Sequence, residues 1–367
     1  MKSRINWLPL VLTMVAVLFG GCSLNAGASR TDSAVPAPEV AKDPEQLIKQ
    51  GEYDISLSPA RELAVIRRVQ LRTGGESSVK SPISVASAGE KGLLICDNNG
   101  HAVQMVPSDS DQVVPLIPRE NEKPLVWPFS MRVWKKSIYV SDNEGIKVYD
   151  QEGLFQRLLR AYYQINDFEI GADGTIYIAP VFRVFKPSNP LLVRLDQEGK
   201  RVDQFGVRLN RAEHRGLDDN AYIAAGDNLI VTAFHYRPLV QFYGAGGKLM
   251  RQIIIDHPIF SRLRPLEQDS AFTHPAESKY RLPAYIAGLK LLNDRVLILL
   301  DLPKPEVVEL NLRGEEVARY RGEAMPGITD YRGFEAEAVG DQYRISTIVT
   351  DNLTFMTLVQ FAASRAK

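Results

Sequence analysis

Three segments of the chain each carry a cationic side chain, and in two of them aromatic residues stand within a few positions of the cation. They read "PVFRVFKPSNP" (180–190), "FHYRP" (234–238) and "DLPKP" (301–305). Cations beside aromatic rings can bind an anionic or aromatic ligand, or a loop of a partner protein. The alternative is that they are solvated loop charges paired with nearby carboxylates. The candidate binding residues are Arg183, Lys186, His235, Tyr236, Arg237 and Lys304, with Phe182 and Phe185 beside them.

The sequence carries no recognisable catalytic motif. It has no G-x-S-x-G, H-E-x-x-H or C-x-x-C, and its five histidines lack the spacing of metal ligands. Glu169, Asp301 and Glu335 are the candidate carboxylates for a hard cation such as Ca²⁺, which prefers oxygen ligands. An enzyme with a bound metal therefore stays open as an alternative to a binding protein, as does a Ca²⁺ ion that only braces the fold. No catalytic residue is assigned, and no cofactor is predicted.

The N-terminal segment has the pattern of a secretory signal. Two positive charges in Met1–Arg4 precede an apolar run from Leu8 to Phe19, which is shorter than the roughly 20 residues of a membrane-spanning helix. The run ends in "LFGGC", which resembles the lipobox of bacterial lipoproteins. The resemblance implies cleavage before Cys22, acylation of that cysteine and anchoring in a membrane, the outer one where the cell has two. The alternative is an ordinary cleaved signal peptide.

The mature chain is close to neutral and begins with a tether. Lys plus Arg equals Asp plus Glu over the whole chain, so no nucleic-acid partner is indicated. Residues 23–42 are small, polar and proline-bearing, and "DPEQLIKQG" (43–51) predicts one short helix with Asp43 as its cap. The predicted domains are a signal peptide (1–21), a lipidated tether (22–52) and a folded domain (53–367). Cys96, alone once Cys22 is acylated, is expected to be a small buried residue.

The folded domain repeats one unit six times. Each unit contains an apolar strand, a polar turn, a second apolar strand, a loop, a third strand, a glycine turn and a charged outer strand. The turn glycines Gly153, Gly199 and Gly247 stand 46 and 48 residues apart. Four strands per unit at a period of about 40–50 residues are typical of a β-propeller. The six units span 82–117, 128–159, 166–206, 220–255, 283–322 and 332–363.

The sixth unit lacks its fourth strand, which predicts how the ring closes. The segment "ELAVIRRVQLRTG" (62–74) resembles the outer strands and has no unit of its own. We expect it to complete the last blade and so remove an open sheet edge. The fold class predicted is therefore all-β, a six-bladed β-propeller whose last blade is completed by an N-terminal strand.

The repeats also carry a family resemblance. The segments "KSIYVSDNEGIKVYDQEG" (136–153), "ADGTIYIA" (172–179) and "VRLDQEGK" (193–200) resemble the NHL-repeat type of six-bladed propeller. That fold hosts ligand sensors, scaffolds, lactonases and lyases, so the resemblance predicts architecture and not activity. Recurring Asp-Asn pairs at 97, 142 and 351 are expected to form turns, and Tyr139, Tyr177 and Phe234 to pack between blades.

In a propeller the loops after the second strands meet at one mouth of the central channel. The three cation-bearing segments occupy this position in the third, fourth and fifth units, next to a long connection at 256–283. Loops longer than the fold requires often bind something. The leading interpretation is an envelope lipoprotein whose propeller binds a protein, peptide or glycan partner at this mouth. The alternative is a metal-dependent hydrolase or lyase of the lactonase-type propeller class.

Overall fold

The computed structural model describes residues 60–71, 79–161, 164–181, 190–206, 220–263, 284–325, 330–351 and 355–366. Cys22, the tether and the expected helix at 43–51 lie outside these ranges. Within them, no helix combines the length and apolar character needed to span a bilayer.

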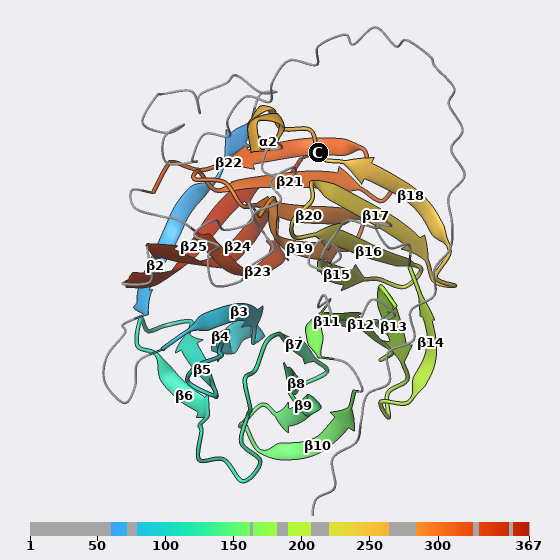
Figure 1. The fold of residues 1–367 in the computed structure, drawn as a ribbon. Coiled ribbons are helices and arrows are strands. Elements are labelled where there is room, and N and C mark those ends of the chain that lie inside the picture. The colour runs from blue at the N-terminus through green and yellow to red at the C-terminus, as the bar shows by residue number, and fades with distance from the viewer. Residues whose placement is uncertain are drawn as a thin grey trace, which may run out of the picture. The chain divides into compact units, whose positions relative to one another are not determined.

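The described strands form six sheets arranged around one axis, and this arrangement confirms the predicted six-bladed propeller (Figure 1). Within each repeating unit, the first strand along the chain lies nearest the axis. The first blade contains β3 (Pro82–Ser87), β4 (Gly92–Asp97), β5 (Ala102–Pro107) and β6 (Val114–Ile117). The second contains β7 (Met131–Trp134), β8 (Ser137–Asp142), β9 (Gly145–Asp150) and β10 (Phe155–Arg160). The third contains β11 (Ile165–Ile170), β12 (Ile176–Pro180), β13 (Leu192–Leu195) and β14 (Arg201–Phe205).

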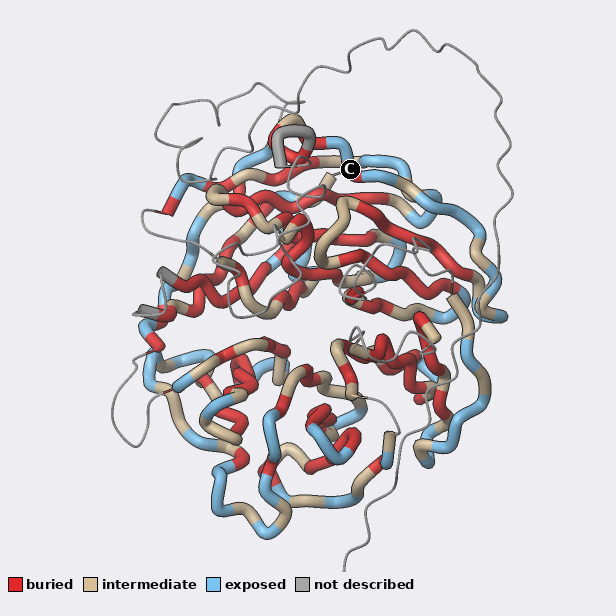
Figure 2. The backbone as a smooth tube through the Cα atoms, in the orientation of Figure 1, coloured by how far each residue is buried: buried red, intermediate tan, exposed pale blue. Residues whose placement is uncertain are grey.

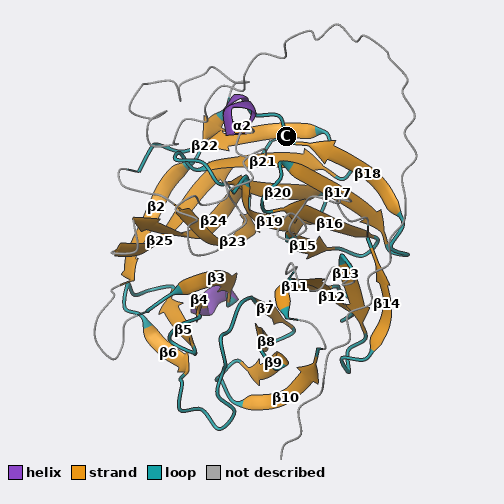
Figure 3. Cartoon of the chain, in the orientation of Figure 1, coloured by secondary structure: helices purple, strands orange, loops and turns teal. Residues whose placement is uncertain are grey.

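The other three blades follow the same order. The fourth contains β15 (Ala221–Ala225), β16 (Leu229–Phe234), β17 (Leu239–Gly244) and β18 (Leu249–Ile254). The fifth contains β19 (Ile286–Leu292), β20 (Arg295–Leu300), β21 (Glu306–Asn311) and β22 (Glu316–Arg321). The sixth contains β23 (Asp330–Val339), β24 (Gln342–Asp351) and β25 (Phe355–Ser364). The short helices η1 (Gly89–Lys91) and α2 (Pro258–Leu263) lie in the connections between strands, η1 between β3 and β4 and α2 between β18 and β19 (Figure 3).

The N-terminal strand closes the ring as predicted. Strand β2 (Ala64–Leu71) pairs antiparallel with β25, with Val69 opposite Leu358, so the sixth blade has four strands like the others. Just before it, the two-residue strand β1 (Arg61–Glu62) pairs parallel with β22 of the fifth blade. This segment therefore pairs with the last two blades and joins the first of the described strands to the last.

Burial explains why the inner strands of each blade contain mostly apolar residues and the outer strand contains charged ones. The second and third strands of each blade are buried along nearly their whole length, while most residues of the fourth strands are exposed or only partly buried (Figure 2). A strand with sheets packed on both faces needs apolar residues at consecutive positions, and an outer strand does not. The sequence pattern that defines the repeat is thus the burial profile of one blade.

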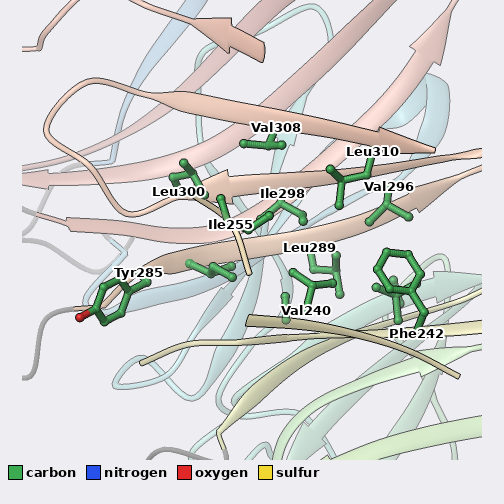
Figure 4. Close-up of a cluster of buried hydrophobic side chains, with 14 of the residues drawn as sticks. Val240, Phe242, Ile255, Tyr285, Leu289, Val296, Ile298, Leu300, Val308 and Leu310 are labelled. Carbon is green, nitrogen blue, oxygen red and sulfur yellow. The ribbon is translucent and has the colours of Figure 1, made fainter. Parts of the chain in front are cut away.

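The core lies between neighbouring blades. One cluster of buried side chains joins the fourth and fifth blades, with Phe242 and Val240 facing Leu289, Val296 and Ile298 (Figure 4). The recurring aromatic residues behave as expected, because Tyr139 packs against the third blade while Tyr177 and Phe234 share the cluster between the third and fourth. Fully burying one such side chain stabilises a protein by about 1.5–3 kcal/mol.

The described Asp-Asn pairs form turns, as predicted. The Asp97 carboxylate accepts hydrogen bonds from the backbone N–H groups of Lys80, Ser81 and Gly100. The Asp142 carboxylate accepts from the N–H groups of Val126 and Glu144. Each aspartate therefore shapes its own turn and also fastens the chain segment that leads into a blade.

Cys96 is fully buried on β4, as expected of a small apolar residue. Burial raises the pKa of its thiol well above the ordinary value, with Asp97 and Asp142 adding to the shift. The thiol therefore stays protonated and unreactive near neutral pH.

Candidate functional site

A cavity of about 220 Å³ lies on the axis of the propeller, at the end of the channel where the turn between β16 and β17 sits. Side chains on, or just before, the first strand of all six blades line it. This shared origin places the cavity where the blades converge. The lining residues are Ile83, Ser84, Phe129, Ser130, Arg132, Asn166, Asp167, Asn220, Tyr222, His235, Tyr236, Gly288, Leu289, Gly333 and Phe334.

β-Bulges turn the innermost strands toward this cavity. The pairing of the first with the second strand shifts register at Pro82/Ser84, Ile165/Asp167, Ile286/Gly288 and Arg332/Phe334. A bulge inserts one extra residue, bends its strand and re-aims a side chain. The same irregularity therefore recurs, in four blades, at the height where the strands line the cavity.

Two glycines let the strands approach closely at the cavity wall. A Cβ at Gly288 would lie 2.1 Å from the Cβ of Phe334, and a Cβ at Gly333 would lie 2.7 Å from the backbone nitrogen of Val85. Gly333 also has a φ of +65°, which disfavours other residues. Larger residues at these two positions would force the fifth, sixth and first blades apart.

Arg132 of the second blade supplies the guanidinium of the cavity, and all three of its nitrogens are hydrogen-bonded to the protein. Its Nε donates to Glu169 at 3.0 Å, and one terminal nitrogen donates to both oxygens of Asp167 at 2.9 and 3.1 Å. The other terminal nitrogen donates to the Ser130 hydroxyl at 3.2 Å and to the Met131 carbonyl at 2.8 Å. Protein acceptors therefore engage every nitrogen of this guanidinium, and Asp167 and Glu169 balance its charge.

The Asp167 carboxylate is equally satisfied. Besides Arg132, it accepts hydrogen bonds from the Ser130 hydroxyl at 2.6 Å and from the backbone N–H of Ile223 at 3.0 Å. Burial lowers the pKa of Arg132, but Asp167 and Glu169 more than offset this, and the pKa is raised above its ordinary value. This cluster links the second, third and fourth blades through charge-assisted hydrogen bonds.

A second ion pair joins the fifth and sixth blades. Lys290 on β19 lies 2.8 Å from a carboxylate oxygen of Glu335 on β23. Burial lowers the pKa of Lys290, but the carboxylates of Glu335 and Glu169 have the larger, opposite effect. The pKa is therefore raised above its ordinary value, and the amine stays charged. Two of the candidate metal-binding carboxylates, Glu169 and Glu335, therefore each have a side-chain cation as partner.

This donor set does not fit a Ca²⁺ site. A Ca²⁺ ion needs six to eight oxygen ligands, whereas Glu169 and Glu335 are turned to Arg132 and Lys290. Asp301 follows β20 and is close enough to Tyr222 to raise its pKa, but it is not among the residues that line the cavity. Within the described ranges, no three His, Cys, Asp or Glu side chains are grouped so that they could hold a metal ion.

Tyr222 and His235 form a polar pair on the cavity wall. The Tyr222 hydroxyl lies 3.0 Å from Nδ1 of His235, and the two rings stack edge to face at 5.6 Å. Burial lowers the pKa of His235 to about 4, although Asp330 opposes the shift. Burial, together with nearby acidic groups led by Asp301, raises the pKa of Tyr222 well above its ordinary value. Both side chains are therefore uncharged near neutral pH.

The backbone of His235 holds this pair in place. Its N–H donates to the carbonyl of Asn220 at 2.9 Å, and its carbonyl accepts from the N–H of Tyr285 at 2.8 Å. The ring of Tyr236 stacks edge to face on the His235 ring with centroids 4.4 Å apart. The segment "FHYRP" therefore contributes a fixed aromatic wall.

The predicted binding residues divide into three groups. His235 and Tyr236 line the cavity. Arg237 and Lys304 are described but are not among its lining residues. Arg183 and Lys186, like Cys22, lie outside the described ranges, as does most of the long connection 256–283. Sequence reasoning did not single out Arg132, Asp167, Asn166 and Tyr222, although the glycines inside the strands at 288 and 333 indicate bulges there.

Comparison with known proteins supports the fold. No protein-family model matches this sequence, and no curated protein matches it. A streptogramin B lyase structure superimposes with a TM-score of 0.50 at 9% identity, covering 80% of this chain and 97% of that one. A virginiamycin B lyase from Staphylococcus aureus has a TM-score of 0.49 at 10% identity, covering 80% and 98%. A gluconolactonase from Xanthomonas campestris has a TM-score of 0.49 at 11% identity, covering 84% and 99%. At such identities the likeness is one of fold alone, the six-bladed β-propeller.

Proposed function

We propose that this protein is a lipid-anchored binding module of the bacterial cell envelope. Its propeller, which we assign to the NHL-repeat type from the sequence of its units, binds part of a peptide, protein or glycan partner in the axial cavity. One observation carries this proposal: all six blades contribute to a single polar cavity whose charged side chains already have partners. Such a wall is preorganised, so a ligand need not reorder it on binding.

The membrane anchor rests on the N-terminal sequence. Met1–Arg4, the apolar run and "LFGGC" together favour acylation of Cys22. Two or three acyl chains on one residue give stable anchoring, since each buried CH₂ contributes about 0.8 kcal/mol. We expect mass spectrometry of the purified protein to find acyl chains on Cys22, and Cys22→Ala to move the protein from the membrane to the soluble fraction. An unmodified Cys22 would refute the anchor and leave the cavity proposal unaffected.

The cavity proposal is tested with ligand-induced stabilisation. The full chain is expressed, extracted in a detergent without a sugar headgroup and melted in the presence of a panel of neutral sugars, amino acids, short peptides and small anions. A ligand that binds only the folded state, at a hundred times its Kd, stabilises by about 2.7 kcal/mol, which raises the melting temperature by several degrees.

The variants localise the effect. Tyr236→Ala removes a ring from the cavity wall in a surface turn, whereas Leu154→Ser changes a residue that is 63% exposed on the outside of the second blade. We expect Tyr236→Ala to abolish the stabilisation and Leu154→Ser to preserve it. A ligand that stabilises both variants equally, or a panel without any stabilising member, would contradict binding in this cavity.

A further inference from the structure

The charged groups of the axial cavity are already paired with one another and hydrogen-bonded to the protein. All three nitrogens of Arg132 donate to protein acceptors, and Asp167 and Glu169 balance its charge, so it offers little to an anion. Asp167 accepts four hydrogen bonds, two on each oxygen, so it offers little to a cation. A charged ligand would lose its hydration in the cavity and gain no direct ion pair.

The groups that remain available are uncharged. Asn166 donates its amide N–H to the Ala221 carbonyl at 2.9 Å, and no group of the described chain donates to its carbonyl oxygen. The Tyr222 hydroxyl is shared with neutral His235 and keeps a second position for a ligand. The Ser84 hydroxyl can both donate and accept. The cavity therefore presents a short set of neutral hydrogen-bonding groups.

Apolar and aromatic surface completes the wall. Phe129, Phe334 and Tyr236 line the cavity next to the polar groups. A sugar ring has the matching chemistry, with C–H faces that pack on aromatic rings and hydroxyls that both donate and accept. Residues from all six blades line the cavity, so it is enclosed on all sides around the propeller axis and is not an open groove. It suits one compact ring better than an extended peptide, which needs a groove or a free strand edge.

We propose that the axial cavity binds an uncharged sugar ring at the end of a glycan. This inference rests on the proposed function, since it names the ligand class of the same cavity. Its volume of about 220 Å³ is below the 300–1,000 Å³ typical of drug-sized ligands, consistent with a single ring entering. Neutral amide and hydroxyl groups, and not ion pairs, then decide which ring is bound.

The test uses one ring in three charge states. The full-length protein, in detergent without a sugar headgroup, is applied to immobilised glycans ending in glucose, glucosamine or glucuronate, and to arrays with other neutral terminal sugars and neutral peptides. We expect at least one neutral terminal sugar to bind, and its amino and acid counterparts to bind at least tenfold more weakly.

Hydroxyl-deletion variants connect the preference to the cavity. Tyr222→Phe and Ser84→Ala each remove one hydroxyl, and we expect each to weaken binding of the neutral glycan by about two- to tenfold. Leu154→Ser is the control and should bind as the unchanged protein does. Circular dichroism confirms folding, and Ser84→Ala keeps the test valid where the larger change at Tyr222 disturbs the core.

The outcomes separate the two proposals. Tighter binding of the acid or amino sugar, or binding of neutral peptides without any glycan, would overturn the neutral-sugar assignment. If that binding is lost in Tyr236→Ala, the cavity still functions as a binding site and only its ligand class is wrong. If no probe binds in a manner that depends on Tyr236, both proposals fail.

Discussion

Acidification should destabilise this protein through His235, and the substitution His235→Asn should remove more than half of that effect. The imidazole is held at a pKa of about 4 because burial disfavours its charged form. In the unfolded chain its pKa is close to 6.5. Below pH 6.5 the unfolded state therefore binds a proton that the folded state does not. Stability is fully present above pH 6.5 and is lost as the pH falls toward 4.

The size of the effect follows from these two pKa values. Between pH 7 and pH 5 the linkage relation gives a loss of about 2 kcal/mol in the free energy of unfolding. Glu306 is the strongly shifted carboxyl nearest this range. Burial alone would raise its pKa, but hydrogen bonds from His257 and Arg321 hold it at about 2. Its contribution is lost only below its unfolded value of 4.5, outside the window.

The assay is urea unfolding at half-unit steps between pH 7 and pH 5, followed by circular dichroism and by tryptophan fluorescence. Asn is the chosen replacement because its carbonyl oxygen can accept the Tyr222 hydroxyl in place of Nδ1. We expect the unchanged protein to lose about 2 kcal/mol over this range and His235→Asn to lose less than about half of that. The two curves should converge as the pH falls.

A second histidine variant tests whether the effect belongs to this site. His101→Asn changes the turn between β4 and β5, where a φ of 54° suits Asn, and leaves His235 in place, so we expect its curve to keep the slope that His235 causes. Equal slopes for all three proteins would refute the reasoning, because they would show that His235 titrates in the folded state as it does in the unfolded chain.

Two further predictions concern lysines. Lys136 has a φ of 67° in the turn between β7 and β8, a conformation that glycine adopts without strain. We therefore expect Lys136→Gly to raise the free energy of unfolding, measured by urea titration, by about 0.5–1 kcal/mol. The control Lys200→Gly changes an exposed residue without positive φ and should lower the free energy of unfolding. A loss of stability in Lys136→Gly would contradict the turn geometry. Lys147 is fully buried against Asp142, and Lys147→Met should cost about 3–5 kcal/mol by the same measurement, because it leaves a buried carboxylate without its cation. Lys91→Met, which breaks an exposed ion pair, should cost under about 1 kcal/mol, and equal losses would contradict the distinction.

The architecture was predictable because each repeat of the sequence follows the pattern of buried and exposed strands in one blade. Each blade needs two strands that are apolar at consecutive positions and an outer strand that is not, and this requirement is visible at a period of 40–50 residues. The closing strand was predictable for a related reason. The sixth unit lacked a charged outer strand, and residues 62–74 were an outer strand without a unit; the pairing of β2 with β25 joins the two.

The cavity was only half predictable, because it forms between residues that no local pattern connects. His235 and Tyr236 stood out as departures from the repeat in a loop. Arg132, Asp167 and Tyr222 sit inside ordinary strands, and their importance arises only when the ring brings β7, β11 and β15 together. The register shifts that turn these strands inward depend on pairing across a sheet, and sequence alone does not reveal pairing.

The ion pairs on the axis explain how a ring of separate sheets keeps a defined cavity. Arg132 joins the second blade to the third through Asp167, and Asp167 accepts the Ile223 N–H of the fourth blade. Lys290 joins the fifth blade to the sixth through Glu335. Buried charges of this kind cost desolvation and add little net stability when compared with an apolar core. What they supply is a fixed geometry, since the charged donors of one blade are held by carboxylates of the next. A cavity wall fixed by saturated charges leaves ligand choice to its neutral groups, and for that reason the hydroxyls of Tyr222 and Ser84 are the decisive positions to change.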